Sequence, residues 1–95
     1  SNENIKSIKS LTNIKTLSTL LVYGTGISDL SYFPNFKNLK SVDLAGCPLT
    51  YDQYYTYLPK CPKLNEFKVG KNDTDGIKAG EDLKKEGSSL KCIIK

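Results

Sequence analysis

The apolar residues between Ile27 and Leu44 follow a spacing that fits neither a simple helix nor a simple strand. In the stretch ISDLSYFPNFKNLKSVDL they recur every third residue five times and then after two residues. An amphipathic helix alternates steps of three and four, and a half-buried strand has steps of two throughout. The same seven positions lie 22 residues earlier, and all of them are apolar: Ile5, Ile8, Leu11, Ile14, Leu17, Leu20 and Val22. The chain therefore contains an internal repeat.

The last part of this repeat returns further along the chain. A leucine followed by apolar residues three and five positions later begins at Leu17, Leu39 and Leu64, in LSTLLV, LKSVDL and LNEFKV. A fourth copy, LKCIIK from Leu90, keeps the first two apolar positions and places Lys95 at the third. Successive copies are 22, 25 and 26 residues apart. The longer steps leave room for true helices between the later copies.

The pattern resembles the leucine-rich repeat family, whose unit reads L-x-x-L-x-L-x-x-N/C-x-L. Cys47 and Asn72 stand at the N/C position, where Thr25 is a departure. The first half is similar to the 22-residue internalin type, and the longer later repeats are similar to the ribonuclease-inhibitor type. The resemblance implies an α/β fold, a short right-handed solenoid of about four repeats with a four-stranded parallel sheet on its concave side. Residues 1–95 would form a single leucine-rich-repeat domain.

The physics of strands and tight helices explains the spacing. Alternate residues of a strand face one side, so the terminal step of two marks a strand. Residues three apart lie on one face of a 3₁₀-like segment, so the steps of three mark a segment that returns the chain along the far side of the core. We expect parallel strands centred on Leu20–Val22, Val42–Leu44, Phe67–Val69 and Cys92–Ile94.

Two helices are predicted in the longer connections. The first, over residues 51–58, places three tyrosines and a leucine at helical spacing and is stopped by Pro59. This spacing favours a core stripe, with a tyrosine-rich binding patch as the alternative. The second helix runs from about Asp75 to Glu86, with Gly87 just beyond its end.

The cysteines are predicted to be free core residues. Cys47, Cys61 and Cys92 form an odd set, so they cannot all pair within one chain. The chain has no His, which leaves a zinc site incomplete and a nucleophilic cysteine without its usual base. We therefore expect neither a metal nor a cofactor, and no enzymatic activity.

One stretch, KNDTDG, has part of the pattern of a calcium-binding loop. Lys71 stands where the first ligand of such a loop would be, which places a positive charge at the metal. The better interpretation is that Asp73 or Asp75 caps the following helix.

Charge and hydropathy exclude two classes of partner. All 14 basic residues are Lys, scattered among 10 acids, and the chain has no Arg, which argues against a dedicated nucleic-acid binder. No apolar run approaches the length of about 18 residues that marks a membrane span, so no membrane insertion is expected. The chain has no Met, which indicates a fragment or a processed chain, and its localisation cannot be read from the sequence.

The resemblance implies a protein–protein interaction module that binds its partner on the concave side of the sheet. If Leu20 and Val22 point into the core, the residues between them point outward. The central row across the sheet would be Leu21, Asp43, Lys68 and Ile94. The predicted partner-binding residues are Thr19, Leu21, Tyr23, Ser41, Asp43, Glu66, Lys68 and Ile94.

Two local contacts are expected on this face. Asp43 and Lys68 lie on adjacent strands and could form an ion pair. Tyr23 faces the small residues Ala45 and Gly70, which leaves a shallow hollow for a partner's side chain unless Tyr23 fills it itself.

Other functions remain open at this stage. The chain could be a structural stub or cap of a larger repeat protein, with no partner of its own, or could belong to an enzyme whose catalytic domain lies elsewhere. Both edges of the predicted sheet are unpaired, and unpaired edges invite further pairing. We therefore also expect weak self-association through an edge strand.

Overall fold

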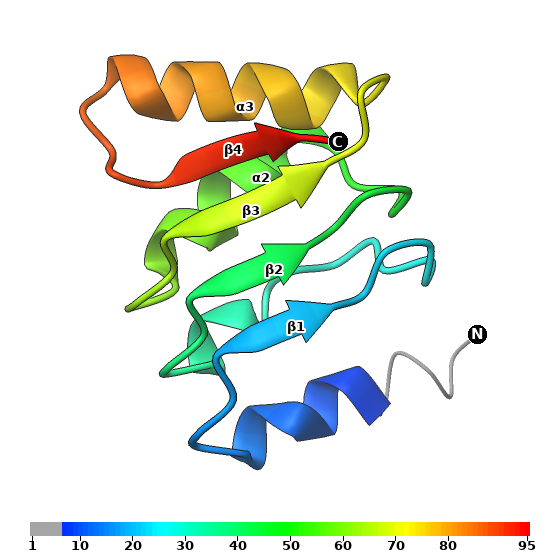
Figure 1. Ribbon diagram of the computed structural model, residues 1–95, viewed down its shortest axis with the longest axis vertical. Coiled ribbons are helices and arrows are strands. Elements are labelled where there is room, and N and C mark those ends of the chain that lie inside the picture. The colour runs from blue at the N-terminus through cyan, green and yellow to red at the C-terminus, as the bar shows by residue number, and fades with distance from the viewer. Residues whose placement is uncertain (1–6) are drawn as a thin grey trace.

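The computed structural model describes residues 7–95, which form an α/β fold around one four-stranded parallel sheet (Figure 1). The strands are adjacent in the order in which they occur along the chain. The predicted α/β class and the four-stranded parallel sheet are confirmed, whereas Ile5, the first apolar position of the predicted repeat, lies outside the described residues. The strands are β1 (Thr19–Leu21), β2 (Ser41–Asp43), β3 (Glu66–Val69) and β4 (Lys91–Ile94).

Each connection between strands contains a helical segment, and the segments lengthen along the chain. Residues 7–10 are helical and lead into a 3₁₀ helix before β1. Figure 1 shows α2 behind the sheet and α3 beside β4. The segments are η1 (Leu11–Asn13), η2 (Phe33–Asn35), α2 (Tyr51–Tyr57), η3 (Leu58–Lys60) and α3 (Thr74–Lys85).

The apolar residues that are spaced three and two apart in the sequence form the core. All seven apolar positions of the stretch from Ile27 to Leu44 are buried, as the spacing predicts. In the preceding copy the pattern is weaker, because Ile14 remains 48% exposed where its counterpart Phe36 is buried. The first copy is the outermost layer of the described chain, and no described segment packs on its outer side to cover Ile14.

The two longer helices complete the core on one side of the sheet. The Tyr54 ring of α2 is fully buried and stacks on Phe67 of β3, with 5.8 Å between ring centroids. Pro59 lies in the 3₁₀ turn that ends this helix. The tyrosine stripe is therefore partly core, although Tyr51 and Tyr55 are only half-buried.

Capping residues set both ends of α3. Asp73 is the N-cap, and its Oδ1 accepts a hydrogen bond from the Gly76 N–H at 2.9 Å. At the other end, Gly87 has a φ of +91°, a conformation that favours glycine. The N–H of Gly87 donates to the carbonyl of Lys84. This C-terminal cap confirms the position that the sequence predicts for Gly87.

Strand β4 lies where the sequence predicts it, over Cys92–Ile94, but its register differs by one residue from the one that the leucine spacing indicates. Phe67 pairs with Cys92, and Val69 pairs with Ile94, so the last step is 25 residues rather than 26. The N–H of Ser88 donates to the Leu83 carbonyl, which turns the chain sharply after α3. The geometry of this helix end, rather than the leucine spacing, fixes where β4 begins.

Candidate functional site

The side of the sheet that faces away from α2 and α3 is covered by no element of residues 7–95 (Figure 1). We call it the open sheet face. Successive residues of a strand point to opposite sides, so the face is formed by the residues that alternate with the buried Leu20, Val42 and Phe67. In the observed register its positions form three rows across the four strands. They are Thr19, Leu21, Tyr23, Ser41, Asp43, Ala45, Glu66, Lys68, Gly70, Lys91, Ile93 and Lys95.

Most of the predicted binding residues lie on this face, but Ile94 does not. The one-residue shift of β4 turns Ile94 and Cys92 to the helix side, where both line a groove with Ile77 and Gly80 of α3. Ile93 takes the place predicted for Ile94. A slip of one residue exchanges the two sides of a strand. The other predicted residues, Thr19, Leu21, Tyr23, Ser41, Asp43, Glu66 and Lys68, lie on the open sheet face.

Exposed apolar side chains gather at the two edges of the open sheet face. Leu21 and Tyr23 of the β1 side are 64% and 59% exposed, and Ile93 of β4 is also exposed. Between them, β2 and β3 present small or polar residues, among which the Ser41 hydroxyl donates to Glu66 Oε2 at 3.3 Å. The face therefore has apolar flanks and a polar centre.

A buried carboxylate occupies that centre. Asp43 is only 4% exposed, and its Oδ2 accepts a hydrogen bond from Lys95 Nζ at 2.7 Å. Its Oδ1 accepts one from the backbone N–H of Ala45 at 3.1 Å. The expected ion pair between Asp43 and Lys68 is therefore wrong. The 25-residue spacing between β3 and β4 places Lys95 on the same face as Asp43. Lys95, rather than Lys68, therefore forms the ion pair with the Asp43 carboxylate.

The same ammonium group contacts an aromatic ring. Lys95 Nζ lies 4.9 Å from the centroid of the Tyr23 ring, within the range of a cation–π interaction. The Lys95 side chain thus reaches from the β4 side of the sheet across β3 to residues of β2 and of the β1 side. The hollow predicted beside Tyr23 is occupied by Lys95 rather than by Tyr23 alone.

The carboxyl group of Asp43 is held in its ionised form. Burial raises its pKa, but the hydrogen bonds from Lys95 and from the Ala45 N–H outweigh this effect, so that the pKa is lowered overall. The positive charge of Lys68 acts in the same direction. Asp43 therefore carries a negative charge throughout the neutral range.

A second hollow adjoins this cluster at the carboxyl ends of β2 and β3. It has a volume of about 540 Å³ and is open to solvent. Lys95 forms one of its walls, and two glycines leave its floor without side chains. The hollow is lined by Gly46, Cys47, Gly70, Lys71, Asn72, Asp73 and Lys95.

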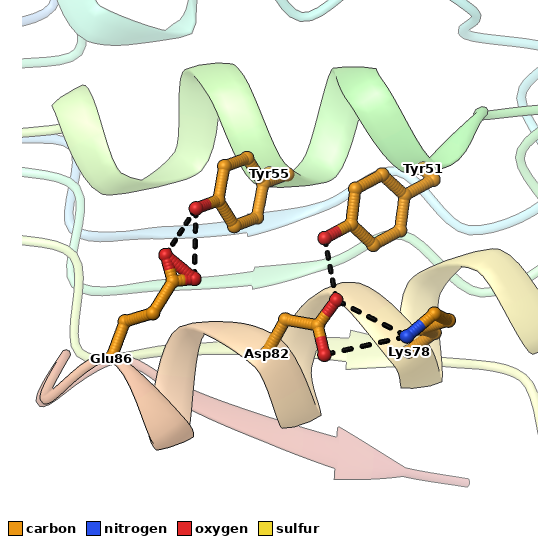
Figure 2. A network of polar contacts seen from close by, with 5 residues as sticks. All are labelled: Tyr51, Tyr55, Lys78, Asp82 and Glu86. Carbon is orange, nitrogen blue, oxygen red and sulfur yellow. Dashed lines mark hydrogen bonds and ion pairs between the residues drawn. The ribbon is translucent and has the colours of Figure 1, made fainter.

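A row of tyrosines and acids joins α2 to α3 on the far side of the sheet (Figure 2). The Tyr51 hydroxyl donates to Asp82 Oδ2 at 2.6 Å, and Asp82 also forms an ion pair with Lys78 at 3.3 Å. One turn further along, the Tyr55 hydroxyl donates to the carboxylate of Glu86. The two tyrosine rings are stacked, with 5.4 Å between centroids. We call this group of five residues the tyrosine–acid seam.

The hydrogen bonds of the tyrosine–acid seam shift the pKa values of its members. The bond to Asp82 raises the pKa of Tyr51 to about 12, and the same bond lowers the pKa of Asp82. The bond to Glu86 raises the pKa of Tyr55. The neutral hydroxyl donating to an ionised carboxylate is thus the stable arrangement at neutral pH.

The sequence contains a signal for this seam. Tyr51 and Tyr55 are four residues apart, and so are Lys78, Asp82 and Glu86, and residues four apart share one face of a helix. Two helices with such faces can pair tyrosines with acids. Choosing this pairing requires knowing that α2 and α3 are neighbours, which the spacing alone does not tell.

Cys47 and Cys61 pack in the core as the sequence predicts, whereas the register of β4 decides the packing of Cys92. Cys47 and Cys61 are buried, and Cys92 is half-buried against Gly80 of α3. Burial raises the pKa of the Cys61 thiol to about 12 and that of Cys92 to about 11. Both thiols are therefore protonated at neutral pH, a state in which cysteine is a poor nucleophile.

Within residues 7–95, no three residues among His, Cys, Asp and Glu lie close enough together to hold a metal ion. In the same part of the chain, no helix is long and apolar enough to cross a membrane. Comparisons with protein-family models, with curated proteins and with solved structures found no match. A function must therefore be argued from the geometry of the molecule itself.

Proposed function

We propose that the chain is a protein–protein interaction module, built as a short leucine-rich-repeat solenoid, that binds its partner through the open sheet face. Two features support the repeat architecture. Equivalent strand positions recur after 22, 25 and 25 residues, and every apolar position of the stretch 27–44 is buried. Stacked repeats of this kind present an extended surface to partners.

The observation that carries the proposal is the exposure of large apolar side chains on a sheet face that no described element covers. Leu21, Tyr23 and Ile93 are exposed there, on both flanks of a charged centre. Apolar side chains gathered on one exposed face are characteristic of interaction surfaces. Aromatic residues such as Tyr23 often supply a large share of the binding energy in protein interfaces.

The charges of the open sheet face favour a protein over a nucleic acid. Glu66 places a carboxylate at the centre of the face, and the negative charge of Asp43 is neutralised there by Lys95. The cationic residues there are all lysines, and the chain has no Arg to read bases or grip phosphates with two hydrogen bonds. A partner with apolar side chains and mixed charges fits this surface.

A capture experiment with matched baits tests the proposal. The chain, immobilised, is exposed to an extract of its source, alongside the variants Tyr23→Ala, Lys68→Glu and Lys63→Glu. Lys63 is exposed in the turn before β3 and makes the same charge change away from the face. We expect a partner that the wild type and Lys63→Glu retain and that both face variants lose. A partner lost only by Lys63→Glu would contradict the proposal.

A second candidate function is structural, as a stub or cap of a larger repeat array. The outer edge of β4, with which no strand of residues 7–95 pairs, favours this second function. Lys91 and Lys95 donate their N–H groups to β3, so the N–H groups of Cys92 and Ile94 point away from the sheet. Ile94 is exposed beside Ile77 of α3, where a further repeat could stack. If the chain is only such a stub or cap, every protein that the wild type captures should also be captured by Tyr23→Ala.

A further inference from the structure

Two groups on the open sheet face hold one ammonium group. Asp43 Oδ2 accepts its hydrogen bond at 2.7 Å, and the Tyr23 ring lies 4.9 Å away. The carboxylate is almost fully buried and is held by the Ala45 N–H. These are the parts of a binding site for a cation, and the chain fills it with its own Lys95.

The Lys95 side chain is less buried than the Asp43 carboxylate that it binds. Its side chain is 43% exposed, and only the ammonium end has specific partners. Its backbone is tied to the sheet by one hydrogen bond, from its N–H to the Val69 carbonyl at 2.9 Å. Holding a long, flexible side chain in place by its end group costs conformational entropy, which favours release of the side chain. The side chain can therefore swing into solvent without disturbing the sheet.

The geometry selects the kind of cation. Asp43 Oδ1 already accepts the Ala45 N–H, so Oδ2, which accepts from Lys95 Nζ, is the oxygen best placed to bind an added cation. A guanidinium group binds a carboxylate best through two parallel hydrogen bonds, which need both oxygens. A primary ammonium is a compact charge that needs one oxygen and can sit over an aromatic ring. The site therefore fits a lysine-type amine better than an arginine.

We propose that Asp43 and Tyr23 form a recognition site for the primary ammonium of a lysine on the protein partner, and that Lys95 is an internal occupant which that lysine displaces. The assignment of the amine to a protein partner rests on the proposed function of the open sheet face. Lys95 competes with the partner because it is attached to the same chain and has a high effective concentration. Its removal exposes the site, and apolar contacts with Leu21 beside the site help the partner's lysine to compete.

The test uses n-butylammonium, a free analogue of the lysine end group, and needs no partner. It is titrated against the wild type and the variants Lys95→Ala and Lys95→Met, while the NMR signals of the Tyr23 ring are followed. Lys95→Met keeps an apolar stem of similar length, so that loss of packing is separated from loss of charge. The reference titrations use sodium chloride at equal ionic strength and neutral n-butanol. The matched control is the double variant Asp43→Asn/Lys95→Ala.

We expect saturable shifts of the Tyr23 signals with n-butylammonium in both Lys95 variants. The apparent affinity should be at least tenfold weaker in the wild type, where the site is filled, and in the Asp43→Asn double variant. Neither reference solute should reproduce the shifts. Equal responses in the double variant and in Lys95→Ala would overturn the inference, and so would the absence of saturation in both Lys95 variants.

The outcome is distinguishable from that of the proposed function. If a captured partner requires Tyr23 and Lys68 but the amine titration fails, the open sheet face binds proteins without an amine site. If the amine titration succeeds, Lys95→Ala should bind the captured partner at least as tightly as the wild type, and Asp43→Asn should bind it more weakly. A partner whose affinity falls in Lys95→Ala and is unchanged in Asp43→Asn would contradict displacement of Lys95.

Discussion

At the scale of single residues, Asp43 and Lys95 show what a sequence pattern can and cannot predict. The alternation along β2 predicts that Asp43 points to the open sheet face, and it does. Its partner could not be predicted, because Lys95 lies 52 residues away and the leucine spacing places it at a core position. A shift of one residue in β4 moves Lys95 to the open face. Charge alone therefore suggested Lys68, the nearer lysine.

The ion pair of Asp43 gives a prediction for stability as a function of pH. Because the folded-state pKa of Asp43 is lowered, its contribution is present above its unfolded pKa of about 3.9 and is lost as the pH falls through the folded value. We expect Asp43→Asn to lower the free energy of unfolding by about 1 kcal/mol at neutral pH, since Lys95 stays partly solvated. The difference from the wild type should shrink in acid.

Denaturant unfolding of both proteins across the acidic range checks this prediction. Glu81→Gln is the matched control, because Glu81 is an exposed acid on α3. Glu81→Gln should change the free energy of unfolding little at any pH. A gap between Asp43→Asn and the wild type that stays constant down to the lowest pH would show that the ionised carboxylate is not the source of the stability.

At the scale of elements, the helices were predicted well in position and less well in their contacts. Proline and glycine mark the ends of helices by their backbone chemistry, so Pro59 and Gly87 were informative. Gly80 is less informative, since a glycine inside a helix indicates only a point of lower helix propensity. The structure gives a reason for the glycine, because a Cβ at position 80 would clash with the Cβ of Cys92. Such packing between α3 and β4 cannot be inferred from local propensity.

Gly80→Ala therefore tests the packing of α3 on β4. Alanine favours a helix over glycine by about 1 kcal/mol, but the added methyl group overpacks the contact at a cost of about 1–3 kcal/mol. We expect a net loss of stability, measured by denaturant unfolding. The double variant Gly80→Ala/Cys92→Gly, which removes the opposing Cβ, should recover part of the loss. A single variant more stable than the wild type would mean that α3 lies further from β4.

The tyrosine–acid seam predicts a loss of stability at alkaline pH. The raised pKa of Tyr51 means that its contribution is present in full below its unfolded pKa of about 10 and is lost as the pH rises through about 12. We expect Tyr51→Phe/Tyr55→Phe to be less stable than the wild type at neutral pH and to lose less stability between about pH 9 and 12.

Tyr57→Phe is the control for this comparison, because Tyr57 is on the same helix and its hydroxyl donates to no carboxylate within residues 7–95. It should follow the wild type at every pH. Thermal unfolding as a function of pH provides the measurement. An alkaline decline that is the same in the double variant and in the wild type would place the titrating groups outside the tyrosine–acid seam.

At the scale of the whole molecule, the spacing of the apolar residues predicts most of the strand arrangement. The spacing predicts four parallel strands in chain order, and both the order and the pairing of β1 to β3 are confirmed. The two ends of the sheet differ in a way that the repeat does not reveal. Residues 7–13 lie beyond β1 (Figure 1). There Ile8 and Leu11 line a hollow together with Leu20. The outer edge of β4 has no such cover among the described residues.

This difference predicts which edge mediates self-association. We expect weak, concentration-dependent association through β4. The charges of Lys91 and Lys95 weaken this association but do not prevent it. Ile94→Lys should abolish it, because Ile94 lies exposed at that edge. Ile14→Lys, an equal change at an exposed isoleucine near the other end, should not. Sedimentation velocity over a range of concentrations provides the measurement, and a strict monomer at high concentration would contradict the prediction.

The location of the partner's contact surface tests the central proposal most directly. The captured partner, added to isotopically labelled chain, would be mapped by its effect on NMR chemical shifts. We predict the largest changes at Leu21, Tyr23, Lys68 and Ile93, with small changes along α2 and α3. Largest changes on the two helices, with the open sheet face unaffected, would show that the partner binds the opposite side of the molecule.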